Sequence, residues 1–256
     1  MFPFIWWLQG GADPEAAAAQ HEGGSDFFRR RAILSSPEQW KPRQGLIGWY
    51  DATFAASASL WLDKSGRNSN MVTAGADPAY SATGWNSAKP ALVFTPDQQL
   101  RTTGPVRNDI LGGPGFSVLA VVDTNNSGDA KFLLQWTDEA VTFMAVQITA
   151  GGLLRIDDNT AGSVSGTLNA EGRRTLAVAI GGGSVSTWVN RSPDLVNEAF
   201  APVLSASNYL AIGVNANGVN GFNGAISEIL IFNHKVTDRI VGLFNAYARE
   251  KWGGLS

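Results

Sequence analysis

The pattern of apolar and polar residues predicts β-strands along most of the chain after residue 44. Seven segments have the length and apolar content of strands, and glycine-rich turns separate several of them. They are Gly115–Val122, Lys131–Trp136, Val141–Thr149, Leu153–Ile156, Thr175–Ile180, Ser184–Asn190 and Ala225–Phe232. In Thr175–Ile180 the large side chains alternate with Ala177 and Ala179, so we expect a second layer to pack closely on the alanine face. Gly181, Gly182 and Gly183 predict a hairpin into the next segment.

The C-terminal end has a helical period instead. Thr237 is a suitable residue to cap such a helix, and Gly253 is suited to end it. The apolar stripe consists of Ile240, Leu243, Phe244 and Tyr247. We expect this stripe to pack on the edge of the sheet domain, with docking into a partner's groove as the alternative.

Residues 1–44 begin with an apolar strip and continue with short helical signals. Asp13-Pro14-Glu15 and Ser36-Pro37-Glu38 each place a capping residue before proline and an acid. The strip is too short to span a bilayer and lacks the basic region of a secretory signal. We therefore expect an arm that docks on another protein. The expected contact residues are Phe2, Phe4, Ile5, Trp6, Trp7 and Leu8.

Composition limits the classes of protein that fit. Hydrophobic residues make up 44% of the 256 positions and charged residues 16%, which excludes disorder of the whole chain. The net charge of −3 gives no sign of the basic surface that binds nucleic acid. The chain has no cysteine, so it can form neither a disulfide nor a thiolate metal site, and this fits synthesis in a reducing cytoplasm.

Frequent strands without intervening helices predict an antiparallel sandwich or barrel over residues 45–256, and the lack of a fixed repeat excludes a propeller. Six segments in order resemble the laminin G-like, concanavalin A-like lectin and glucanase domains found in phage and bacterial proteins. They are Gly48–Ala52, Leu60–Asn68, Pro90–Phe94, Phe116–Val122, Phe222–Phe232 and Tyr247–Gly253. The resemblance implies an all-β, concanavalin A-like jelly-roll sandwich of two antiparallel sheets, preceded by the partly helical arm and followed by the helix.

Residues for catalysis are not evident from their spacing. Hydrolases of this fold carry paired acids as E-x-D-x-E or E-x-D-x-x-E on one strand, and the chain has no such motif. Asp157 and Asp158 must point to opposite faces of a strand, and Glu228 has no acidic partner two or four positions away. The two histidines, His21 and His234, form no zinc or triad spacing. We therefore predict that the chain is not an enzyme, unless acids from different strands meet.

Candidate binding residues remain. Exposed aromatic rings could stack on sugars, and Trp85, Trp136 and Tyr209 are the candidates, each with a core role as the alternative. No cofactor is expected; the weak candidates for a structural calcium ion are Asp51 and Asp63, which lack a recognised ligand spacing.

These features together predict a virion structural or attachment protein, either a capsid decoration or a tail or fibre component. The arm would bind other virion proteins, and the lectin-like domain would face outward toward a host-surface glycan. Synthesis in the host cytoplasm and assembly as a homo-oligomer or in many copies follow from that role. The alternative is a free carbohydrate-binding lectin.

Overall fold

The computed structural model describes residues 45–103, 115–124, 131–137, 142–158, 162–202, 209–213 and 221–255. The predicted arm, residues 1–44, lies outside the described residues. Its expected contacts Phe2, Phe4, Ile5, Trp6, Trp7 and Leu8 lie outside them too, so anchoring through the arm stays a prediction.

The described residues form sixteen strands and one helix. The strands of the first half are β1 (Leu46–Ser57), β2 (Leu60–Asp63), β3 (Met71–Thr73), β4 (Ala79–Trp85), β5 (Lys89–Phe94), β6 (Gln99–Thr102), β7 (Gly115–Thr124) and β8 (Lys131–Thr137). Those of the second half are β9 (Thr142–Ile148), β10 (Leu153–Asp158), β11 (Gly162–Asn169), β12 (Gly172–Gly181), β13 (Ser184–Val189), β14 (Ser192–Ala199), β15 (Tyr209–Gly213) and β16 (Gly224–Phe232). Helix α5 (Asp238–Trp252) follows. Each of the seven predicted segments overlaps one of these strands; Thr149 and Asn190 lie just beyond the ends of β9 and β13, and Val141 lies outside the described residues.

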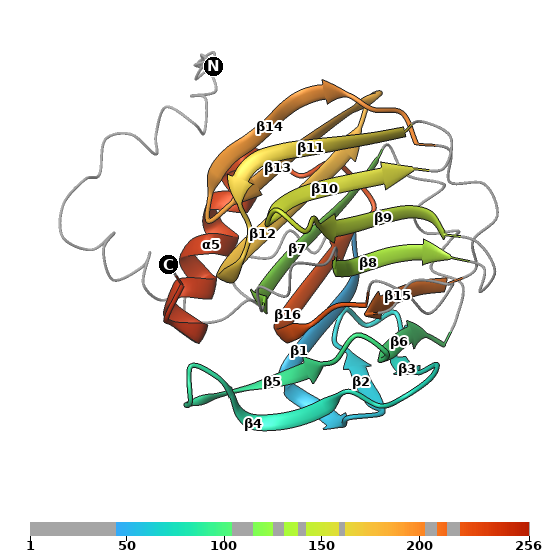
Figure 1. Ribbon diagram of the computed structural model, residues 1–256, viewed down its shortest axis with the longest axis vertical. Coiled ribbons are helices and arrows are strands. Elements are labelled where there is room, and N and C mark those ends of the chain that lie inside the picture. The colour runs from blue at the N-terminus through green and yellow to red at the C-terminus, as the bar shows by residue number, and fades with distance from the viewer. Residues whose placement is uncertain are drawn as a thin grey trace, which may run out of the picture.

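The strands form one continuous antiparallel sheet that curls on itself (Figure 1). Its order is β11-β10-β9-β8-β15-β6-β3-β2-β1-β16-β7-β12-β13-β14, with β5 also paired to β16 and β4 to β5. The end strands approach each other, because the Asp194 carboxylate of β14 accepts hydrogen bonds from the β11 amides of Thr167 and Leu168 at 2.6 and 2.8 Å. The prediction of an antiparallel all-β domain is confirmed, while the sheet is nearly closed and barrel-like and does not by itself confirm a division into two sheets.

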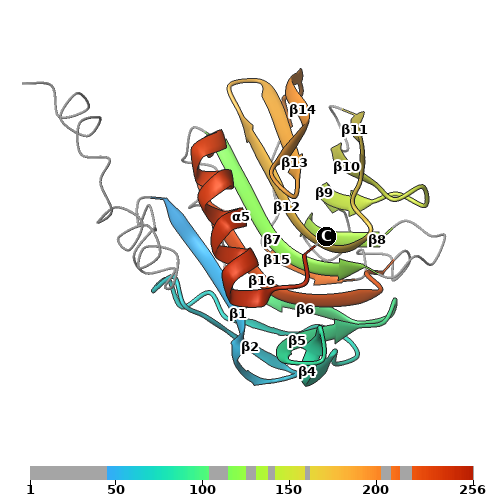
Figure 2. The same ribbon diagram turned by 90° about the vertical axis from the view of Figure 1, so that its left-hand side faces the viewer.

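Helix α5 lies across the outer face of β1, β16, β7 and β12 (Figure 2). It begins after Thr237 and ends at Gly253 as predicted, although the Thr237 side chain makes no capping hydrogen bond. Thr175, on the same face of β12 as Ala177 and Ala179, donates a hydrogen bond from Oγ1 to Asn245 Oδ1 of the helix at 3.4 Å. The expected close layer on the alanine face is therefore this helix. No helix in the described part of the chain is long and apolar enough to cross a membrane.

The opposite face of the same strands points into an apolar core that includes large aromatic side chains. Tyr50 and Trp61 are buried there, and their ring centres lie 5.8 Å apart. The predicted hairpin between β12 and β13 is confirmed, and Gly182 and Gly183 both have positive φ, as a tight two-residue turn requires.

Candidate functional site

The structure brings two carboxylates together beneath helix α5. Asp51 of β1 and Glu228 of β16 are directly paired across these strands, so their side chains share a face. The Lys251 ammonium lies between them, 2.7 Å from Asp51 Oδ2 and 3.2 Å from Glu228 Oε2. Spacing within one strand could not reveal this pair, because its members belong to strands far apart in the sequence.

Glu228 is fully buried, and both of its oxygens accept hydrogen bonds. The indole N–H of Trp49 donates to Oε1 at 2.8 Å, and that of Trp252 donates to Oε2 at 2.7 Å. The Tyr247 hydroxyl lies 3.1 Å from each oxygen. Together with Lys251, four side chains from β1 and α5 therefore converge on one carboxylate.

Asp51 is almost as deeply buried and is also fully partnered. Its Oδ1 accepts from the backbone amide and the hydroxyl of Thr53 at 2.9 and 2.6 Å. Its Oδ2 lies 3.6 Å from the Lys64 ammonium, in addition to Lys251. We call this set the helix joint; its members are Trp49, Asp51, Lys64, Glu228, Tyr247, Lys251 and Trp252.

The charges of the helix joint balance, with two acids against two lysines. Burial raises the pKa of Glu228, and the nearby Lys251 charge opposes that shift. Burial likewise lowers the pKa of Lys64, against the attraction of Asp51. Because Glu228 is 0% and Asp51 1% exposed, a substrate has no route to either carboxylate. The arrangement therefore fastens the helix to the sheet and does not form an acid–base pair open to a ligand.

The calcium candidates are occupied by protein donors. Asp51 belongs to the helix joint. Asp63 Oδ1 accepts from the amides of Trp49 and Ser65 at 3.0 and 2.8 Å, and its Oδ2 from the amide of Ser69 at 3.1 Å. Its role is to hold a turn, as predicted for this residue type. Within the described ranges no group of three His, Cys, Asp or Glu side chains is placed to hold a metal ion.

The glycan-stacking candidates lie in three different settings. Trp85 of β4 is fully buried, and its indole N–H donates to the carbonyl oxygens of Trp252 and Gly253 at 3.0 and 3.1 Å. It occupies the core position that was its alternative, and its ring cannot stack on a sugar there. Trp136 lies in β8, but its side chain is outside the described residues. Tyr209 begins β15, is partly exposed, and stacks with the Arg101 guanidinium 4.8 Å from its ring centre.

A second polar surface lies on the far side of the core from helix α5. Directly paired residues of β10, β9, β8, β15 and β6 form a row on the face that alternates with the core residues. We call this the polar row: Asp157, Ala145, Gln135, Ala211 and Arg101. The middle of the row is buried, whereas Asp157 and Arg101 at its ends are partly exposed. Four strand spacings of about 4.8 Å separate these ends by roughly 19 Å along the sheet.

The Asp157 end of the polar row carries the densest polar group. Arg155 precedes Asp157 by two positions on the same face, and its Nη2 lies 2.6 Å from Asp157 Oδ1. Gln147 of β9 donates to the other oxygen of Asp157. The two ionised side chains keep exposed fractions of 39% and 28%, so a ligand can reach them. Asp158 points to the opposite face and is buried, as strand alternation predicted.

Sequence reasoning missed most of this surface. Arg101, Gln135, Gln147 and Arg155 were not singled out. Alternation places Arg155 and Asp157 on one face of β10, so that signal was available for one strand. Pairing between β10, β9, β8, β15 and β6 joins segments whose order in the sheet is not their order in the chain, and no local pattern carries that information.

No protein family model matches the chain, and no curated protein matches it. Solved structures do share its fold. The sialidase of Trypanosoma rangeli in complex with the inhibitor DANA has a TM-score of 0.61 and 13% identity, over 89% of this chain and 38% of the sialidase. Domain 4 of an extracellular arabinanase from Geobacillus stearothermophilus, in complex with arabinotriose, has a TM-score of 0.58 and 16% identity, over 78% of this chain and 98% of that domain.

A third structure concerns botulinum neurotoxin type C, whose cell entry depends on interaction with two ganglioside molecules. It has a TM-score of 0.57 and 10% identity, over 78% of this chain and 50% of the toxin chain. The present chain thus spans about two fifths of the sialidase chain and half of the toxin chain in these structures. At these identities the likeness shows the fold alone: a β-fold shared with proteins that bind or cleave carbohydrates.

These comparisons correct one prediction. The chain was expected not to be an enzyme, and that exclusion is wrong, because the fold recurs in sialidases and in an arabinanase. The missing E-x-D-x-E motif excludes only hydrolases that place both acids on one strand, and Asp51 and Glu228 show that acids from different strands do meet in this chain.

Other parts of the predictions are not shown by these comparisons. The resemblance to laminin G-like phage domains is not confirmed by any family model. The location in a virion, the binding of other virion proteins and the assembly in many copies stay predictions.

Proposed function

We propose that residues 45–256 form a carbohydrate-binding domain of the concanavalin A-like kind, with the curled sheet serving as a jelly-roll sandwich. The observation that carries the proposal is the match to 98% of an arabinanase domain solved with arabinotriose, since that domain consists of this fold and little else. The structure of the sialidase in complex with sialic acid, and that of the toxin whose cell entry depends on gangliosides, support the same class of ligand.

The polar row is the surface that suits such a ligand best. Sugar hydroxyls are donors and acceptors at once, and they pair well with a carboxylate beside a guanidinium. Arg155 and Asp157 offer this pair at one end, and the Tyr209 ring with Arg101 offers a stacking surface at the other. Because these ends are separated by roughly 19 Å along the sheet, only an oligosaccharide is long enough to contact both.

A glycan array probed with the full chain tests the proposal. We expect binding to oligosaccharides and much weaker binding to the corresponding monosaccharides. The double variant Arg155→Met/Asp157→Asn should lose this binding roughly 10-fold or more, because it removes charge-assisted hydrogen bonds to the ligand. Arg239→Met is the matched control, since Arg239 is an exposed arginine on helix α5, away from the polar row.

Two results would count against the proposal. An array without any bound glycan contradicts carbohydrate binding by this chain. Binding that is equal in wild type and in the Arg155→Met/Asp157→Asn variant keeps the function and removes the polar row as its site.

A further inference from the structure

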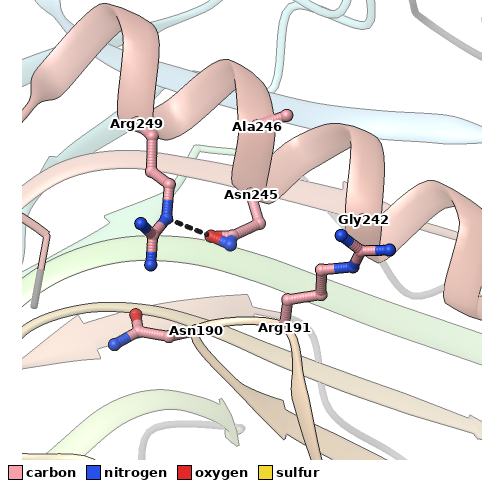
Figure 3. Close-up of a pocket in the computed structure, with 6 residues that line it drawn as sticks. All are labelled: Asn190, Arg191, Gly242, Asn245, Ala246 and Arg249. Atoms are coloured by element: carbon pink, nitrogen blue, oxygen red, sulfur yellow. Dashed lines mark hydrogen bonds between the residues drawn. The ribbon is translucent and has the colours of Figure 1, made fainter.

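A pocket of about 330 Å³ lies between helix α5 and the tip of the β13–β14 hairpin. Two residues of the tip and four from one helix face line it: Asn190, Arg191, Gly242, Asn245, Ala246 and Arg249. The helical residues follow the i, i+3, i+4, i+7 spacing of a single face. Figure 3 shows the Arg249 side chain descending from the helix and Arg191 rising from the turn, with the Asn245 amide between them. The pocket is separate from the polar row, so it does not depend on the proposed function.

Asn245 is a largely buried residue that lines this pocket and supplies a donor to it. Its side chain is 4% exposed, and its Oδ1 accepts from Arg249 Nε and from Thr175 Oγ1, both at 3.4 Å. Because an arginine nitrogen can only donate, the atom of Asn245 that faces Arg249 must be the carbonyl oxygen Oδ1. The amide nitrogen Nδ2 therefore points away from Arg249. Within the described residues that NH₂ group has no hydrogen-bond acceptor, and the pocket is the space it borders.

The charge of the pocket is positive and uncompensated. Two guanidinium groups, those of Arg191 and Arg249, belong to its lining, and no lining residue is acidic. Neither arginine forms an ion pair with a carboxylate among the described residues. The guanidinium groups and the amide NH₂ can only donate hydrogen bonds, so a ligand of this pocket must accept them. A negatively charged acceptor forms the strongest such bonds.

Two positions at the pocket carry residues that are unfavourable for their local backbone conformation. Asn190 and Arg191 have φ values of 50° and 72° in the two-residue turn, where the second position favours glycine. Gly242 occupies the helix interior, where alanine would be more stable. A Cβ at Gly242 would lie 3.4 Å from Arg191 Nε. A strained arginine and a helix-weakening glycine thus meet at one place, as is typical of residues kept for binding.

We propose that this pocket binds an oxyanion group, a carboxylate, sulfate or phosphate, carried on a molecule about the size of a sugar. The oxyanion lies between the Arg191 and Arg249 guanidinium groups and accepts a hydrogen bond from the Asn245 amide. The volume exceeds that of a bare ion and falls at the lower end of small-molecule sites, which is why the anion is assigned to a larger ligand.

Isothermal titration of the full chain with sulfate, phosphate, glucuronate and glucose tests the proposal. Ionic strength is kept constant with sodium chloride, so that general screening does not mimic binding. We expect saturable binding of the anions and none of glucose. Arg191→Gly and Arg249→Met should each weaken anion binding about 10- to 100-fold, since each removes charged hydrogen bonds. Arg239→Met, a solvent-exposed arginine of the same helix outside the pocket, should leave it unchanged.

Arg191→Gly keeps the test clear of folding artefacts, because glycine relaxes the left-handed turn and should not lower the urea midpoint. Tighter binding of glucuronate than of phosphate identifies an acidic sugar as the ligand; the reverse order identifies a phosphorylated group. Equal responses in wild type and both arginine variants, or no saturable response to any anion, overturn the proposal. Because glucose and neutral glycans are not ligands here, this outcome is independent of the glycan array.

Discussion

The helix joint and the polar row both contain ionised side chains, yet they differ in how completely the protein satisfies them. At the helix joint Glu228 and Asp51 are 0% and 1% exposed and surrounded by donors from β1 and α5. At the polar row Arg155 and Asp157 pair mainly with each other and with Gln147, and they retain access to solvent. A charge with a full set of protein partners holds the fold together. A charged side chain that stays accessible to solvent and has hydrogen-bonding capacity left can bind a ligand.

The largest effect should come from breaking the helix joint. Glu228→Ala leaves the Trp49 and Trp252 indole N–H groups without the acceptor they share, and it removes one of the two carboxylates that hold the Lys251 ammonium. Removing one member of a buried ion pair in this way costs about 3–5 kcal/mol. We expect a loss of that size in the free energy of unfolding, measured by urea denaturation.

Glu250→Ala is the matched control for Glu228→Ala. It removes an exposed acid of the same helix and should change the free energy of unfolding by less than about 0.5 kcal/mol. Equal effects of the two variants would show that the burial and partners of Glu228 do not matter to stability, and the contrast between the two regions would lose its basis.

The pH dependence of stability separates the two regions by a smaller amount. Burial raises the pKa of Glu228 above its ordinary value, so the folded chain binds that proton more tightly than the unfolded chain does. This contribution is fully present below the unfolded pKa and is lost as pH rises through the folded pKa. The free energy of unfolding of wild type, minus that of Glu228→Gln, should therefore fall as pH rises above about 4.5.

The slope of that difference cannot exceed about 1.4 kcal/mol per pH unit for one proton. Urea denaturation of both proteins at several pH values measures it. A difference that increases with pH would mean that Lys251 outweighs burial and depresses the pKa of Glu228. In that case the helix joint would be stabilised by its ion pair.

How far the sequence predicts the fold depends on the range of the interactions involved. Alternation in Thr175–Ile180 predicted both the strand and the closely packed second layer, because a strand face with small alanine side chains leaves room for another element to approach closely. The end of α5 at Gly253 was predictable too, because a glycine that follows a helix is itself a local signal for its end. The curling that brings β11 to β14 was not, since it depends on the Asp194 side chain and on sheet twist accumulated over many strands.

The candidate sites follow the same division. Asp63 was predicted as a weak calcium candidate, and it holds a turn through local bonds to Ser65 and Ser69. Trp85 was proposed as a sugar contact with a core role as the alternative, and its indole bonds to the carbonyl of Trp252 at the other end of the described chain. The pocket beside α5 joins a turn to a helix that the sequence separates widely. Contacts between segments so far apart in the chain are not visible in the spacing of residues along the sequence.

The smallest effect on stability should come from the polar row, and that makes it the sharpest test of the contrast. Arg155→Met/Asp157→Asn removes a pair whose side chains are 39% and 28% exposed, so solvent already screens its attraction. We expect the free energy of unfolding to change by no more than about 0.5–1 kcal/mol, measured by urea denaturation, against the several kcal/mol lost in Glu228→Ala. If the double variant instead unfolded as readily as Glu228→Ala, the pair would be part of the framework. Any loss of glycan binding in it would then report on folding and could not locate the ligand.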